Sequence, residues 1–194
     1  MWAAHRATVG YNAATRAIDL GASTTIIGTQ VRPAVEAINF LLEGGALARD
    51  RSIADAVDLT PSSLKQEHLK GMRNALIAIA WKTSADTYRD SSLASEQAVR
   101  AAWLTKSVEA AEKAPNLIPK AWAYSRKVEA VAANGDTHAL KCNVNPDVNE
   151  CRMAIGAYAS AIAGIGLGFS NYSDVKKTDV IKKLQTAQND LTLV

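Results

Sequence analysis

The chain has 194 residues, of which 48% are hydrophobic and 21% charged, and this balance excludes a disordered polar chain and a low-complexity fibre. Alanine occurs 36 times and aromatic residues only 11 times; because alanine favours helices over strands, the composition predicts an all-α fold. The net charge is +3 and both signs are mixed along the whole chain, so the sequence disfavours nucleic-acid binding.

The amino-terminal segment carries Arg6 and Arg16 before its first acidic residue, Asp19. It lacks the long apolar core and small-residue cleavage site of an intact secretory signal. Its Arg-rich, acid-poor composition is typical of an organelle-targeting segment, but an ordinary first helix is the interpretation that we favour. Removal of a signal that preceded residue 1 is a third interpretation.

Prolines, glycines and capping residues mark the ends of the first expected helices. Pro33 begins a helix that Gly44 and Gly45 end, and Thr60-Pro61 begins a longer helix that runs to Tyr88. In the longer helix, apolar residues recur at steps of three and four, which predicts a buried central helix: Leu69, Met72, Leu76 and Ile79.

Three further helices are predicted over residues 92–113, 119–133 and 178–190. Asn134-Gly135 is expected to end the second of them, because these residue types often close helices in a left-handed conformation. Residues 136–148 are then expected to be irregular. Since no linker divides the chain, we predict one helical domain over residues 1–194, a bundle of six to eight helices with one short cysteine-bearing loop.

An apolar stretch over residues 153–173 carries no charged side chain. Its length matches a membrane span of about 20 residues, and a buried helix of a soluble bundle explains it equally well. Small residues recur in it at every fourth position: Gly156, Ser160, Gly164 and Gly168. This spacing lets two helix backbones approach closely, so we predict a tight helix–helix contact here, within the chain or with a neighbour.

The two cysteines, Cys142 and Cys151, flank a short segment that contains a proline. This arrangement predicts a disulfide, and hence an oxidising, non-cytosolic compartment such as the periplasm, the extracellular space, a virion or the intermembrane space. Two free thiols in a reduced protein are the alternative. A metal site could be built from these cysteines, His138 and either Asp147 or Glu150, but the paired spacings of structural zinc sites are missing, so we expect no metal.

No catalytic motif stands out in the chain. There is no G-x-S-x-G sequence and no P-loop, and the glycines at 164, 166 and 168 lie in an apolar run rather than between a strand and a helix. We therefore expect no enzyme and no cofactor, and predict a structural or accessory subunit of a larger assembly. It would contact other protein subunits or a second copy of itself, with membrane contact left open. The alternative is a soluble secreted or periplasmic helical module that binds a small apolar ligand.

Overall fold

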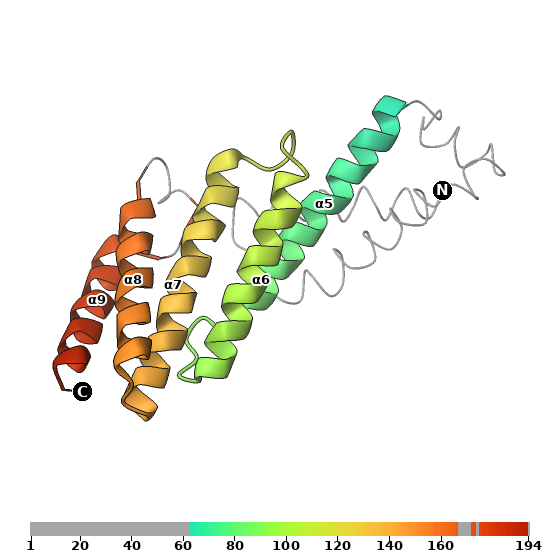
Figure 1. Ribbon diagram of the computed structural model, residues 1–194. Coiled ribbons are helices and arrows are strands. Elements are labelled where there is room, and N and C mark those ends of the chain that lie inside the picture. The colour runs from blue at the N-terminus through green and yellow to red at the C-terminus, as the bar shows by residue number, and fades with distance from the viewer. Residues whose placement is uncertain (1–62, 167–171, 174, 194) are drawn as a thin grey trace. The chain divides into compact units, whose positions relative to one another are not determined.

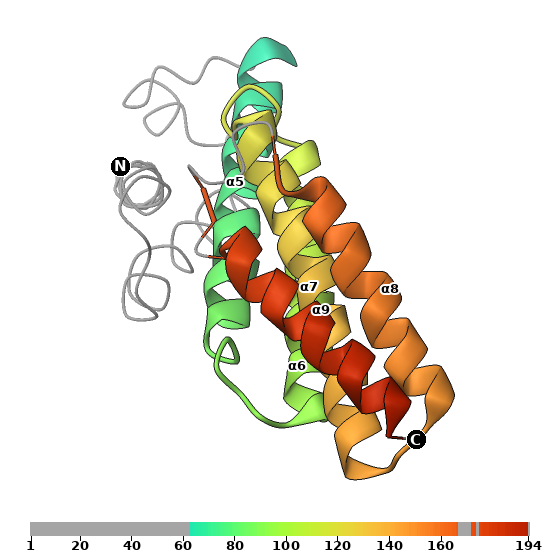
Figure 2. The same cartoon turned by 90° about the vertical axis from the view of Figure 1, so that its left-hand side faces the viewer.

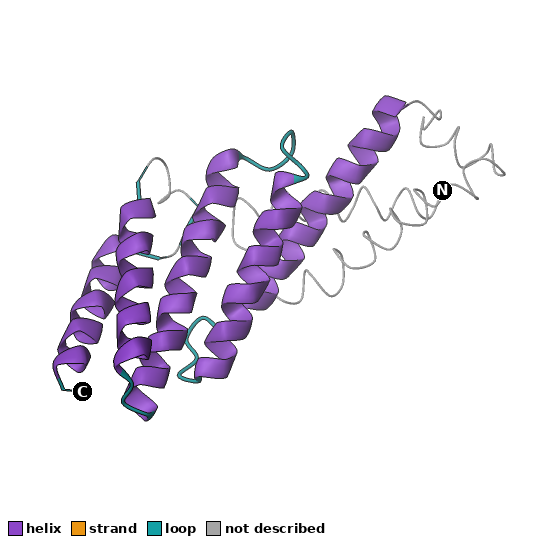
Figure 3. Ribbon diagram, viewed as in Figure 1, coloured by secondary structure: helices purple, strands orange, loops and turns teal. Residues whose placement is uncertain are grey.

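A computed structural model describes residues 63–166, 172–173 and 175–193 of the chain, and Figure 1 shows the five helices within them. These are α5 (Ser63–Asp86), α6 (Ala94–Glu112), α7 (Lys120–Val144), α8 (Val148–Gly164) and α9 (Lys177–Thr192). No strand occurs in these three ranges (Figure 3), so the all-α prediction is confirmed, whereas the count of six to eight helices is not confirmed. The helix expected from Pro33 and the amino-terminal segment lie outside the described residues.

The chain divides into two compact units. One unit comprises Met1–Thr83 and Glu109–Pro119, and the other comprises Ser84–Val108 and Lys120–Val194.

In the first unit, the middle of α5 is buried. Leu76 and Ile79 belong to the predicted apolar face, and they are 0% and 3% exposed, so the prediction of a buried helix is confirmed for these two residues. The amide of Asn74 donates a hydrogen bond to the carbonyl of Lys113 at 3.4 Å. This bond joins α5 to the segment that follows α6.

In the second unit, α7 packs against a helix on each of two sides (Figures 1 and 2). On one side, Leu104 of α6 and Ala85 pack against Ala133. On the other side, α8 packs against both α7 and α9, and small side chains fill most of the core that the three helices share: Val128, Ala132, Ala154, Tyr158, Ala161, Val180 and Ala187. Because alanines dominate this core, neighbouring helices can approach closely.

Helix α7 is longer than the sequence predicts. We expected Asn134-Gly135 to end it, but α7 continues through both residues to Val144, so that prediction is wrong. The reason lies in the packing, because a Cβ atom at Gly135 would lie only 2.6 Å from Cε1 of Tyr158. The glycine makes room for the tyrosine ring against the α7 backbone, and that packing offsets a helix-propensity penalty of about 1 kcal/mol.

The connection between α7 and α8 is correspondingly shorter than predicted. Residues 136–148 were expected to be irregular, but only residues 145–147 lie between the two helices. Asp147 is the N-cap of α8, and its Oδ1 accepts a hydrogen bond from the Asn149 N–H at 2.8 Å. The expected cysteine-bearing loop is therefore a tight helical hairpin.

Helix α8 also differs from the predicted apolar segment, because it ends at Gly164. The Ile165 N–H caps it by donating to the carbonyls of Ala161 and Ile162. Glycines at 164 and 166 favour an end at this point, since glycine loses the most backbone freedom in a helix. Among the helices that the structure describes, none combines the length and the apolar character needed to cross a membrane.

Candidate functional site

The α7–α8 hairpin holds the predicted cysteine pair. Cys142 lies in the last turn of α7 and Cys151 in the first turn of α8, and the structure joins them in a disulfide with Cα atoms 5.3 Å apart. Both side chains are buried, at 3% and 0% exposure. This pairing agrees with the predicted disulfide and is compatible with an oxidising compartment.

Charged side chains flank the disulfide on both helices. His138 Nδ1 lies 2.5 Å from Glu150 Oε2, and Lys141 Nζ lies 3.7 Å from Glu150 Oε1. Among the residues with described side chains, no three histidine, cysteine or acidic residues are arranged to hold a metal ion. The disulfide uses both sulfur atoms of the four-ligand set considered from the sequence, and Asp147 caps α8 instead.

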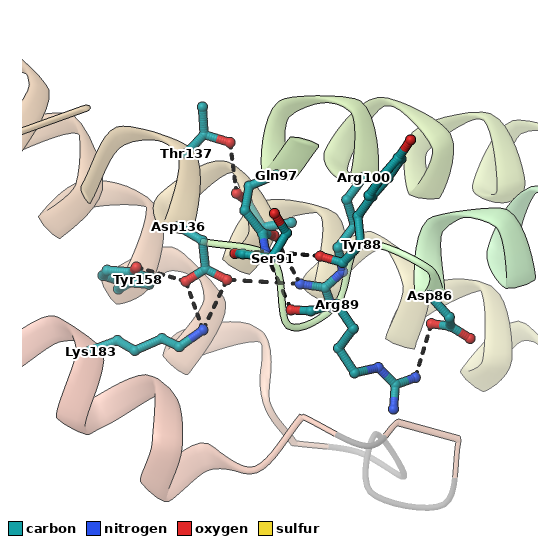
Figure 4. Close-up of polar contacts among 11 residues, drawn as sticks. Asp86, Tyr88, Arg89, Ser91, Gln97, Arg100, Asp136, Thr137, Tyr158 and Lys183 are labelled. Carbon is teal, nitrogen blue, oxygen red and sulfur yellow. Dashed lines mark hydrogen bonds and ion pairs between the residues drawn. The ribbon is translucent and has the colours of Figure 1, made fainter. Parts of the chain in front are cut away.

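A buried carboxylate lies among polar side chains of several helices in the second unit (Figure 4). Asp136 of α7 is 8% exposed and accepts a hydrogen bond from the Tyr158 hydroxyl at 2.8 Å. Lys183 Nζ donates to both of its oxygen atoms, at 2.7 and 2.9 Å, and Arg100 Nη1 lies 3.8 Å from Oδ2. One residue from each of the helices α6, α7, α8 and α9 therefore meets at this carboxylate.

The same cluster extends to the chain segment that precedes α6. Arg100 donates to Oε1 of the buried Gln97 at 3.3 Å. The Gln97 amide nitrogen in turn lies 3.0, 3.3 and 2.8 Å from the carbonyl oxygens of Tyr88, Arg89 and Ser91 (Figure 4). The Gln97 side chain thus contacts three carbonyls of this connection, the Ser91 hydroxyl donates to Glu96 of α6, and Gln97 links the connection through Arg100 to Asp136.

Tyr158 acts in this cluster as a hydrogen-bond donor. Burial raises the pKa of its hydroxyl far above the usual value of 10.0, and the Asp136 charge and the hydrogen bond to Asp136 raise it further. The hydroxyl therefore keeps its proton in the folded state. The arrangement holds four helices together, because the buried Asp136 of α7 has partners on α6, α8 and α9.

A second buried ion pair lies on α7. Arg126 is 2% exposed, and its Nη2 lies 3.1 Å from Oε1 of Glu129, while its guanidinium lies 5.1 Å from the centre of the Trp122 ring. The Ser173 hydroxyl donates to the same Glu129 oxygen. This contact attaches the segment after α8 to α7.

The small residues of the predicted stripe lie in two different environments, one exposed and one packed against α7. Gly156 and Ser160 are exposed, and a Cβ atom at Gly156 would meet nothing within 4 Å. A Cβ atom at Gly164 would lie 2.7 Å from Cγ2 of Val128, so this glycine makes a close contact with α7. Gly168 lies outside the described residues. The tight helix–helix contact of all four residues stays a prediction. Because Gly156 and Ser160 are exposed, their part of that contact would have to be made with a neighbouring molecule.

The sequence predicts the disulfide but not the Asp136 cluster, because its pattern places residue 136 in an irregular segment. The signal that could have revealed it is a glycine directly before an aspartate within a pattern that otherwise continues as a helix, since such a glycine indicates close packing. No protein-family model matches the chain, and neither a curated protein nor a solved structure is similar to it.

Proposed function

We propose that the protein is a non-enzymatic structural or accessory subunit that acts through helix–helix contacts with other subunits or with a second copy. The observation that carries the proposal is the outward face of α8. Five exposed residues of this face are uncharged and mostly small: Met153, Gly156, Ala159, Ser160 and Ala163.

The composition of this face differs from that of an ordinary solvated helix. A helix on the surface of a globular protein usually presents charged and polar side chains to water. Here Arg152 is the last charged residue before the uncharged face begins. Small side chains let a second helix approach closely, and dispersion contacts then accumulate along the pair without the desolvation of any charge. These properties support a helix-docking role.

The proposal is tested by the mass of the native particle. Light scattering after size-exclusion chromatography of the natively extracted protein is expected to show an assembly larger than 20.6 kDa. The substitution Ala159→Arg places a bulky charge on the face and is expected to dissociate that assembly while the melting temperature of the isolated chain stays unchanged.

The matched control is Thr186→Arg, which adds the same charge to an exposed position of α9. It should leave the assembly intact. A natively extracted protein that is monomeric at every concentration, or an assembly that both variants leave unchanged, would contradict the proposed function.

A further inference from the structure

A pocket of about 410 Å³ lies where α7 ends and α8 begins. Its volume falls in the range of about 300–1,000 Å³ that is typical of small-molecule sites, and it is open to solvent, since four of its lining residues are exposed: Lys141, Val144, Asn145 and Asp147. The lining residues come from α6, from the end of α7 and from the α8 hairpin: Ala94, Leu140, Lys141, Val144, Asn145, Asp147 and Glu150. The pocket therefore belongs to the second unit alone and does not include the outward face of α8.

The walls of this pocket are fixed by covalent and polar contacts. The disulfide joins Cys142, which follows Lys141, to Cys151, which follows Glu150, so it ties together the two helix ends that carry the charged walls. The Glu150 carboxylate is held by His138 at 2.5 Å. Asp147 is held by its capping bond to the backbone of Asn149. A site held in this way loses little conformational freedom when a ligand binds.

The chemistry of the lining combines two carboxylates with an apolar wall. Asp147 uses one acceptor position for its capping bond, and a carboxylate offers about four. Leu140 and Val144 supply aliphatic surface, and Val144 is 85% exposed. From these observations we infer that the pocket binds an ammonium group carried on a short aliphatic stem, with the charge at Asp147 and Glu150 and the stem against Leu140 and Val144.

The charge balance favours a cation over an anion. Lys141 is the one basic residue of the lining, its side chain is 50% exposed, and it lies 3.7 Å from Glu150. A half-exposed lysine can swing towards water, whereas both carboxylates are held in place. With Lys141 counted, the lining carries a net charge of −1. An incoming ammonium group competes with Lys141 and His138 for Glu150, whereas Asp147 has further acceptor positions to offer.

The inference is tested by nuclear magnetic resonance on the full, oxidised, ¹⁵N-labelled chain. Three probes of four carbon atoms each are titrated in separate experiments: n-butylammonium, butyrate and 1-butanol. We expect saturable shifts of the backbone amides of Ala94 and of residues 140–150 with n-butylammonium only. Equal shifts with butyrate or with 1-butanol would overturn the inference.

Two variants with opposite expected signs sharpen the test. Asp147→Asn keeps an N-capping residue but removes a charge, and it should weaken n-butylammonium binding by about 3- to 10-fold. Lys141→Gln removes the competing cation and should strengthen binding by about 2- to 5-fold. The matched control is Asp179→Asn, at an exposed position in the first turn of α9 outside the lining, which should leave the dissociation constant unchanged.

An unchanged dissociation constant in Asp147→Asn, or weaker binding in Lys141→Gln, would overturn the inference. The ammonium group can come from a free amine or from a lysine side chain of a protein, and two further probes separate these sources. Putrescine represents the free amine, and a peptide with one central lysine between alanines represents the side chain. Binding of either probe supports the ammonium chemistry and identifies its source, and binding of neither overturns it. The pocket lining includes none of the exposed α8 residues on which the proposed function rests, so failure here is distinguishable from failure of the proposed function.

Discussion

Helices α8 and α9 lie side by side on the same core, yet their outward faces have opposite characters. Both helices contribute small apolar residues to this core, with Ala154 and Ala161 on α8 and Val180 and Ala187 on α9. The outward face of α9 carries the charged and polar residues expected next to water: Lys177, Asp179, Lys182, Gln185, Thr186, Gln188 and Asn189. Packing against the core explains both inward faces, and contact with water explains the outward face of α9. Neither explains the uncharged outward face of α8.

The largest loss of stability is expected at the Asp136 carboxylate, which binds Tyr158 of α8 and Lys183 of α9 on their inward side. Asp136→Ala is expected to lower the free energy of unfolding by about 3–5 kcal/mol, because it leaves the buried Arg100 without its acidic partner and removes the partner of Tyr158. Urea unfolding of the oxidised protein measures this loss. Asp179→Ala removes an exposed carboxylate of α9 and should cost less than about 1 kcal/mol. Similar losses in the two variants would contradict the central role of Asp136.

Two glycine substitutions compare the packed inward side of α8, which Gly135 of α7 contacts, with its open outward side, where Gly156 lies. Gly135→Ala places a Cβ atom 2.6 Å from the Tyr158 ring and is expected to destabilise the protein by about 1–2 kcal/mol. Gly156→Ala meets open space and should stabilise the monomer by about 0.5–1 kcal/mol through helix propensity. Chemical unfolding at low protein concentration measures both effects. Shifts of the same sign would show that the two glycines do not differ in the way that the packing indicates.

Alkaline pH tests the link between α8 and Asp136. Burial, and then Asp136, raise the pKa of Tyr158 far above 10.0, so the folded state keeps the phenol neutral while the unfolded state ionises near pH 10. The stabilisation is therefore complete below pH 10 and is lost as the pH rises, by about 1.4 kcal/mol per unit above that value.

The measurement is the difference in unfolding free energy between the wild type and Tyr158→Phe, followed from pH 9 to 11. This difference cancels the titration of the other tyrosines and of the lysines. A difference that stays constant over this range would contradict the raised pKa.

The sequence predicts the helices well where prolines mark their ends. Pro115 follows the end of α6 at Glu112, and Pro119 directly precedes α7, because proline cannot continue a helix but is tolerated at its start. The helix end predicted at Asn134-Gly135 is wrong because glycine has two roles. It can end a helix or let a neighbouring side chain approach closely, and a local sequence pattern does not distinguish the two. The neighbour, Tyr158, is 23 residues further along the chain.

The two features of the candidate site, the disulfide and the Asp136 cluster, also differ in how well the sequence predicts them. The cysteine pair could be predicted because its two members are close in sequence and few other cysteine arrangements exist. The Asp136 cluster could not, since its residues come from four helices and span positions 97 to 183. The hydrophobic periodicity of a single helix does not indicate that these side chains meet. Within its own helix, each of them is one polar residue among many.

The position of the disulfide has a mechanical consequence for the α7–α8 pair. A force that pulls α8 away from the unit meets a covalent bond at the Cys151 end, so the load passes directly into α7. At the other end, the Gly164–Val128 contact is made only by van der Waals forces. The two helices should therefore part from the Gly164 end first and open like a hinge about the disulfide.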